Sequence, residues 1–223
     1  MEKQLIKILE LLAFAVSAMA FGYGAFSLLR DGIAKFFQLY VCAAGCYMLE
    51  ELWVIVNSLL GNGSADGLIT VRLFGFFGCL CFLISANVNA PEERKDEKSA
   101  NLLSLIAPLL LLSLYAGYAL SPRNTEPFAG KIIGFLSISP ALFASCFSAR
   151  RLLQKAEKNS FSDVVRKIDI LTLIFYAANY GYPLAYLYCS ATVMGICDLL
   201  LAVMVLGMIA LCRKGASRWT ICT

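Results

Sequence analysis

The 223-residue sequence contains no histidine. This absence excludes serine–histidine and cysteine–histidine hydrolysis, and it excludes metal sites that depend on histidine ligands. The nine cysteines are odd in number and include no Cys-x-x-Cys pair, so we expect neither a cysteine-ligated metal nor a disulfide framework. The sequence therefore predicts no metal and no cofactor.

Charged residues are also scarce. They make up 15% of the chain, hydrophobic residues make up 60%, and the mean hydropathy is +0.74. A soluble domain has about 25% charged and roughly 45–50% apolar residues. The apolar residues fall in blocks of about 20, the length that crosses ~30 Å of hydrocarbon. Composition thus predicts an integral membrane protein embedded in the lipid bilayer, and the basic residues show no pattern typical of nucleic-acid binding.

We expect one all-α membrane domain over residues 1–223, with seven transmembrane helices. The predicted spans are Leu5–Leu29, Phe36–Leu60, Gly67–Asn89, Leu102–Leu120, Gly130–Ala149, Ile170–Tyr188 and Thr192–Cys212.

Loop charges predict the orientation of these spans. Lys3, Lys7, Arg123 and Lys131 fall on one side, whereas almost all other basic residues fall in the opposite loops and the C-terminal tail. Because basic residues are enriched in cytoplasmic loops, the N-terminus is expected outside and the C-terminus inside. The plasma (cytoplasmic) membrane is the expected location.

The second span carries two adjacent carboxylates, Glu50 and Glu51, near its middle. A charge at that depth costs on the order of 3 kcal/mol on insertion scales, so it is normally retained for function. Glu10 and Asp198 also lie within spans in the outer half. Asp169 lies at the inner edge of its span, where we expect it to reach water.

Glu50 and Glu51 point about 100° apart on a helix, so they cannot share one face. We expect Glu51 to form a structural ion pair with Arg72 on the next span. Glu50, Glu10 and Asp198 would bind a proton, a cation or another small solute in an outward-facing cavity. The alternative is a buried ion-pair network that only locks helices together.

The sixth span has a polar and aromatic stripe that includes Asn179 and Tyr180. Pro183 removes the amide partner of the Asn179 carbonyl, which is then available to a ligand. We therefore include Asn179 and Tyr180 among the expected ligand-binding residues.

Similar polar positions recur in spans two and six and again in spans three and seven. They suggest a 3+1+3 pattern of parallel repeats, residues 5–89 and 130–212, joined by a linker helix at 102–120. Seven spans in this arrangement resemble the topology of SWEET and PQ-loop transporters. The Pro-Gln motif of those families is absent, and so are their prolines in the first two spans.

The leading interpretation is a small membrane transporter with an acidic outward-facing cavity and proton coupling. The alternatives are a seven-helix sensor that signals through a partner chain and a structural subunit of a homo-oligomer or of a membrane complex. Catalysis is not expected. The paired glutamates of membrane CAAX-type proteases are followed by an arginine, whereas this chain has Ile55 at that position, and those proteases also need histidines.

Overall fold

The computed structural model describes residues 2–29, 35–60, 65–89, 98–154 and 160–219. Within these ranges the chain is all-helical, and no strand occurs. The helices are α1 (Glu2–Leu28), α2 (Lys35–Leu60), α3 (Ala65–Asn89), α4 (Lys98–Leu103), α5 (Ile106–Ala119), α6 (Phe128–Leu153), α7 (Ser160–Tyr188) and α8 (Ala191–Trp219).

The helix bounds differ from the expected spans at several points, among them the end of α8, which continues seven residues past Cys212 to Trp219. The fourth span consists of two helices, α4 and α5, with a turn at Ser104 and Leu105. Pro108 explains this break, because proline has no amide hydrogen to donate to the carbonyl four residues earlier, that of Ser104. Helix α6 continues past Ala149 to Leu153, and α7 begins ten residues before Ile170. Both extensions carry charged residues into the helical bundle.

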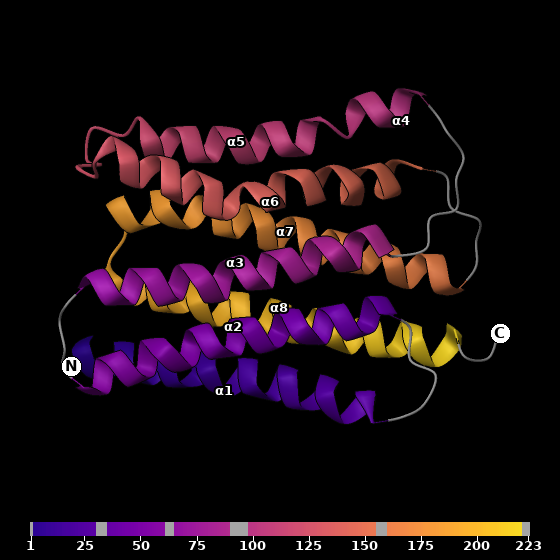
Figure 1. Cartoon of the computed structure of the whole chain (residues 1–223), viewed down its shortest axis with the longest axis horizontal. Helices are drawn as coiled ribbons and strands as arrows, with labels where there is room; N and C mark the ends of the chain where they lie inside the picture. Colours follow the sequence, from indigo (N-terminus) through magenta and orange to yellow (C-terminus); the bar gives the residue numbers. More distant parts are fainter. Residues whose placement is uncertain (1, 30–34, 61–64, 90–97, 155–159, 220–223) are drawn as a thin grey trace.

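The long helices lie side by side and alternate in direction along the chain (Figure 1). Helix α2 packs against α1, α3 and α8, whereas α6 packs against α3, α5 and α7. Helix α8 also packs against α1 and α7, which closes the bundle. Helix α5 contacts α6 and α7 on the outside of this arrangement.

The two ends of the bundle differ in charge. Helices α1, α3, α6 and α8 all end on the same side of the bundle, and we call this side the basic end. It carries basic residues at the ends of α6 and α8 and near the start of α7: Arg150, Arg151, Arg213, Lys214, Arg166 and Lys167. The other end, where α1 begins, is called the opposite end. The N- and C-termini of the chain thus lie at different ends of the bundle (Figure 1).

Five helices in the described part of the chain are long and apolar enough to cross a membrane: Gln4–Leu28, Lys35–Asn57, Asn101–Ala119, Phe128–Leu153 and Ala191–Lys214. Helix α3 is apolar over the shorter stretch Gly75–Val88. Polar residues of α7 such as Asn179 lower its hydropathy, so it is not among the five. These helices indicate an integral membrane protein.

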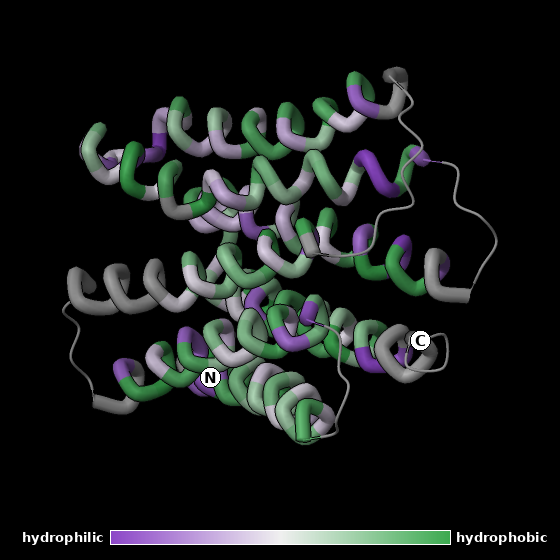
Figure 2. Tube along the Cα trace, turned by 45° about the vertical axis from the view of Figure 1, so that its right-hand side comes forward, coloured by the Kyte–Doolittle hydropathy of each residue, from purple (hydrophilic) through white to green (hydrophobic). Residues whose placement is uncertain are grey.

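The outward surfaces of α1 and α5 are apolar. Leu11 and Met19 on α1 and Leu109 and Leu110 on α5 are among the exposed large hydrophobic side chains. Hydrophobic residues predominate along the helices in Figure 2. In water such a surface would be unfavourable, whereas lipid tails solvate it without cost.

Candidate functional site

The adjacent glutamates of α2 are both buried in the bundle. Glu50 is 5% exposed and Glu51 is 2% exposed. The backbone of α3 comes close to Glu50, because a Cβ atom on Gly75 would lie 3.0 Å from the Glu50 Cβ. Glu50 therefore emerges from α2 on the side that faces α3, and glycine at position 75 permits that close approach.

Tyr47 indicates where the other glutamate lies. Its hydroxyl donates to the backbone carbonyl of Asp198 on α8 over 3.5 Å, and its ring meets the Phe175 ring of α7 edge-on at 6.1 Å. Glu51 follows Tyr47 by four residues and so lies on nearly the same side of α2, one helical turn along. That side faces the interior between α7 and α8.

Asp198 is half-buried, and the hydroxyl of Tyr182 on α7 donates to its Oδ2 atom over 3.1 Å. One turn earlier on α8, Gly195 packs against Leu9 of α1, since an added Cβ would lie 3.1 Å from the Leu9 Cδ1 atom. Glu10 is the next residue of α1 and is also half-buried. The structure thus brings α1, α2, α7 and α8 together at the level of these carboxylates.

Asn179 and Tyr180 occupy different sides of α7. Asn179 lies four residues after Phe175 and three before Tyr182, so it shares their side, toward Tyr47 and Asp198. Its Nδ2 donates to the Phe175 carbonyl over 2.7 Å. Tyr180 is fully buried on the side toward α6, and its hydroxyl donates to the Ile138 carbonyl over 2.7 Å.

We define the acidic site as Glu10, Glu50, Glu51 and Asp198 together with Tyr47, Asn179 and Tyr182. The expected ion pair between Glu51 and Arg72 stays a prediction, because the side chain of Arg72 lies outside the described side chains. Tyr47 and Tyr182 were not among the expected site residues. Their positions one turn from Glu51 and Asn179, respectively, are the signal that could have identified them.

A second buried polar group lies nearer the basic end. The Nε atom of Arg151 on α6 donates to Asp169 Oδ2 on α7 over 2.9 Å, and its Nη2 donates to Asp169 Oδ1 over 2.5 Å. The side chains are 7% and 0% exposed, respectively. The expectation that Asp169 reaches water is therefore wrong. The ten extra residues at the start of α7 place Asp169 inside the bundle, where Arg151 satisfies its charge.

Asn87 at the end of α3 joins this pair to the rest of the bundle. Its backbone carbonyl accepts from Arg151 Nη1, and its side-chain Oδ1 accepts from Arg151 Nη2 over 3.1 Å. The same Oδ1 accepts from the Tyr40 hydroxyl of α2 over 3.1 Å, and Asn87 Nδ2 donates to the Tyr176 hydroxyl of α7 over 3.2 Å. We call Tyr40, Asn87, Arg151, Asp169 and Tyr176 the Arg151 network.

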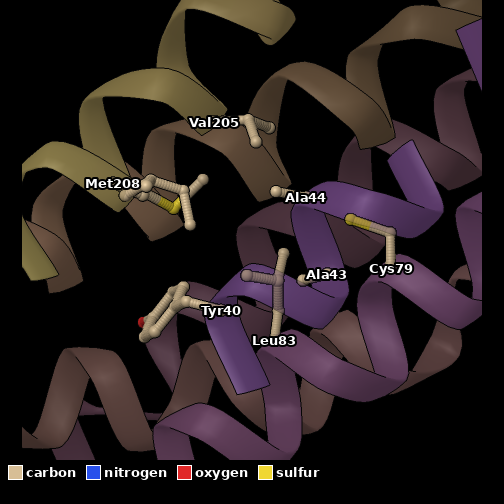
Figure 3. Close-up of a pocket in the computed structure, with 8 residues that line it drawn as sticks. Tyr40, Ala43, Ala44, Cys79, Leu83, Val205 and Met208 are labelled. Atoms are coloured by element: carbon tan, nitrogen blue, oxygen red, sulfur yellow. The ribbon is translucent and has the colours of Figure 1, made fainter. Parts of the chain in front are cut away.

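A small apolar hollow lies between α2, α3 and α8, next to this network (Figure 3). Tyr40, Leu83, Met208 and Val205 are among the residues that line it. Tyr40 also belongs to the Arg151 network, and the Thr172 hydroxyl of α7 donates to the sulfur of Met208 over 3.4 Å. The hollow is thus bounded by polar contacts at the basic end and apolar side chains elsewhere, and it offers no charged group to a ligand.

No group of three cysteine or carboxylate side chains among the described residues is arranged to hold a metal ion. Comparison of the chain with protein-family models, curated proteins and solved structures finds no match. The two buried polar groups and the helix arrangement are therefore the features that bear on function.

Proposed function

We propose that the chain is a small multi-pass membrane transporter, which moves a small solute or cation through the acidic site. The observation that carries this proposal is the burial of Glu50 and Glu51 in the interior of an apolar helix bundle. Ionisable groups at that depth are expensive to retain, and in membrane proteins they mark the paths of ions, protons and substrates. Glu10, Asp198 and Asn179 complete the proposed set of ligand-binding residues, whereas Tyr180 lies on the side of α7 toward α6 and is left out of it.

The helix arrangement supports movement of two halves against each other. The first three long helices, α1, α2 and α3, can be matched in order with α6, α7 and α8. In this comparison the contact of α1 with α2 corresponds to the contact of α6 with α7. Likewise α2 with α3 corresponds to α7 with α8, and α1 with α8 corresponds to α6 with α3. The bundle can therefore be read as two triplets with the same internal order, and α5, which packs on α6 and α7, as the linker of the proposed 3+1+3 repeat.

In the proposed orientation all seven predicted spans cross the plasma membrane, and the basic end faces the cytoplasm. The acidic site then opens toward the outside. Because Glu51 lies on the side of α2 that faces Asp198, these two carboxylates would take up a proton or a cation there, in place of an ion pair between Glu51 and Arg72. Rocking of the triplets would release it at the basic end. Tyr47 and Tyr182 would hold Asp198 in place through their hydrogen bonds.

Proteoliposomes that contain the purified chain and an entrapped pH-sensitive dye test this function. Sodium, potassium, methylamine and choline are added in turn under an imposed pH gradient, and the decay of the gradient is followed. We expect one of these probes to accelerate the decay, and E50Q, E51Q and D198N to slow it at least tenfold. The matched control is E126Q, because Glu126 is an exposed carboxylate outside the acidic site. No flux with any probe, or flux at the parent rate in all three variants, would overturn the assignment.

The sensor alternative is favoured by one observation, the exposure of Arg166 and Lys167 at the basic end. These side chains could contact an acidic cytoplasmic partner. Specific co-purification of such a partner, lost in a double variant with R166E and K167E, together with absence of flux, would support the sensor function instead.

A further inference from the structure

The Arg151 network connects the two triplets at the basic end. Tyr40 and Asn87 belong to α2 and α3 of the first triplet, whereas Arg151, Asp169 and Tyr176 belong to α6 and α7 of the second. The Asn87 side chain takes part in three hydrogen bonds, with Tyr40, Arg151 and Tyr176. Arg151 is shared between the triplets, since it binds Asp169 in its own triplet and Asn87 in the other.

From this arrangement we propose that the Arg151 network is a latch that closes the bundle at the basic end. Opening at that end requires α3 to separate from α6, because these helices meet there and run in the same direction. Such a separation breaks the two bonds from Arg151 to Asn87 and the bond from Asn87 to Tyr176. The bonds between Arg151 and Asp169 can remain intact, because both residues belong to the same triplet.

Burial and pairing give the latch two stable positions. While it is closed, the guanidinium is satisfied by the carboxylate of Asp169 and by both oxygens of Asn87. After α3 moves away, water that enters at the basic end can hydrate the released amide and guanidinium hydrogens. An intermediate without either set of partners is costly, since buried polar groups need hydrogen bonds. The network therefore favours a closed or a fully opened basic end over states between them.

The acidic site lies between the latch and the opposite end of the bundle. Thr172 and Met208 join α7 to α8 beside the network, and the fully buried Cys212 follows Met208 by one turn. Cys212 is thus a native reporter for opening at the basic end. The latch rests on the proposed transport function for its role, but its opening can be measured without a substrate.

The test uses the full chain with Cys212 as its only cysteine, reconstituted in vesicles of each orientation and exposed to a membrane-impermeant maleimide. We expect slow labelling from both sides in the parent. D169N and Y176F should label at least tenfold faster from the basic end alone. The matched control is D163N, which removes an exposed ion pair with Lys167 at the same end and should label at the parent rate.

Y176F keeps the ion pair between Arg151 and Asp169 intact. If D169N fails to fold, labelling of Y176F therefore tests the latch by itself. Parent-rate labelling of Y176F and of folded D169N would overturn the latch, as would equal acceleration from both sides or in D163N. Parent-rate labelling of Cys212 in Y176F and D169N, together with flux that E51Q slows, would overturn the latch and leave the transport proposal in place. Faster labelling from the basic end without flux of any probe would support the latch and overturn transport.

Discussion

Arg151 and Asp169, eighteen positions apart in the sequence, form a two-bond ion pair inside the bundle, and Asn87 of α3 holds the same guanidinium from the other side. Two long helices and the end of a third are fixed relative to one another by this single cation. The stability of the bundle at the basic end should therefore depend strongly on each charge.

Removal of one charge from this pair should be strongly destabilising. R151A leaves the carboxylate of Asp169 buried without its cation, and we expect a loss of about 3–5 kcal/mol in the free energy of unfolding. The exposed pair of Asp163 and Lys167 gives the control, where D163N should cost less than about 0.5 kcal/mol. Unfolding in detergent micelles, followed by tryptophan fluorescence, measures both. Equal losses in the two variants would contradict the buried pairing.

Replacement of both charges by apolar residues separates stability from latching. In R151M/D169L no buried charge remains unpaired, so the free energy of unfolding should recover most of the loss seen in R151A. The two Arg151 donors to Asn87 are nevertheless absent, and Cys212 should label quickly from the basic end. A double variant that is as unstable as R151A would show that the pair contributes more than charge compensation.

Gly75 on α3 tests the packing of α3 on α2, and Gly22 on α1 is its control. A methyl group at Gly75 would lie 3.0 Å from Glu50 Cβ and 3.3 Å from the carbonyl oxygen of Cys46, so G75A should cost about 1–3 kcal/mol. Gly22 has no atom within 4 Å of an added Cβ, and G22A should gain about 0.5–1 kcal/mol from helix propensity. Denaturation of both variants in the same detergent checks the prediction. A loss in G22A as large as that in G75A would contradict this helix contact.

Tyr182 should be a positioning residue for Asp198. Y182F removes the hydrogen bond to Asp198 Oδ2 but keeps the ring, so the protein should fold with little change. Under the proposed function, the probe concentration for half-maximal flux should rise several-fold, because the carboxylate is no longer held in one orientation. Y186F is the control, since Tyr186 is exposed on the same helix. Identical concentration dependence in the two variants would remove Tyr182 from the site.

Several features of this fold could be predicted from sequence because they depend on the composition of single segments. Apolar blocks gave the helices, and the second block placed Glu50 and Glu51 far from either helix end, in agreement with their burial. Tyr47 was harder to identify, since its contact with Asp198 depends on how α2 crosses α8.

The Arg151 network could not be predicted in this way. Arg150 and Arg151 read as a pair of loop charges, because no pattern in the sequence shows that α6 continues to Leu153 while α7 starts at Ser160. Asn87 is one polar residue at the end of an apolar block. Only the packing of α3, α6 and α7 brings its side chain to Arg151, and packing between distant segments leaves no periodic signal in any one of them.

The accessibility of position 51 from the two sides of the membrane decides between an outward-open acidic site and a sealed structural core. A cysteine at this position, in a chain without its native cysteines, is exposed to a membrane-impermeant maleimide added at either end. We predict faster labelling from the opposite end than from the basic end while Arg151, Asp169 and Asn87 are intact. Absence of labelling from the opposite end, or faster labelling from the basic end, would contradict the proposed transport path.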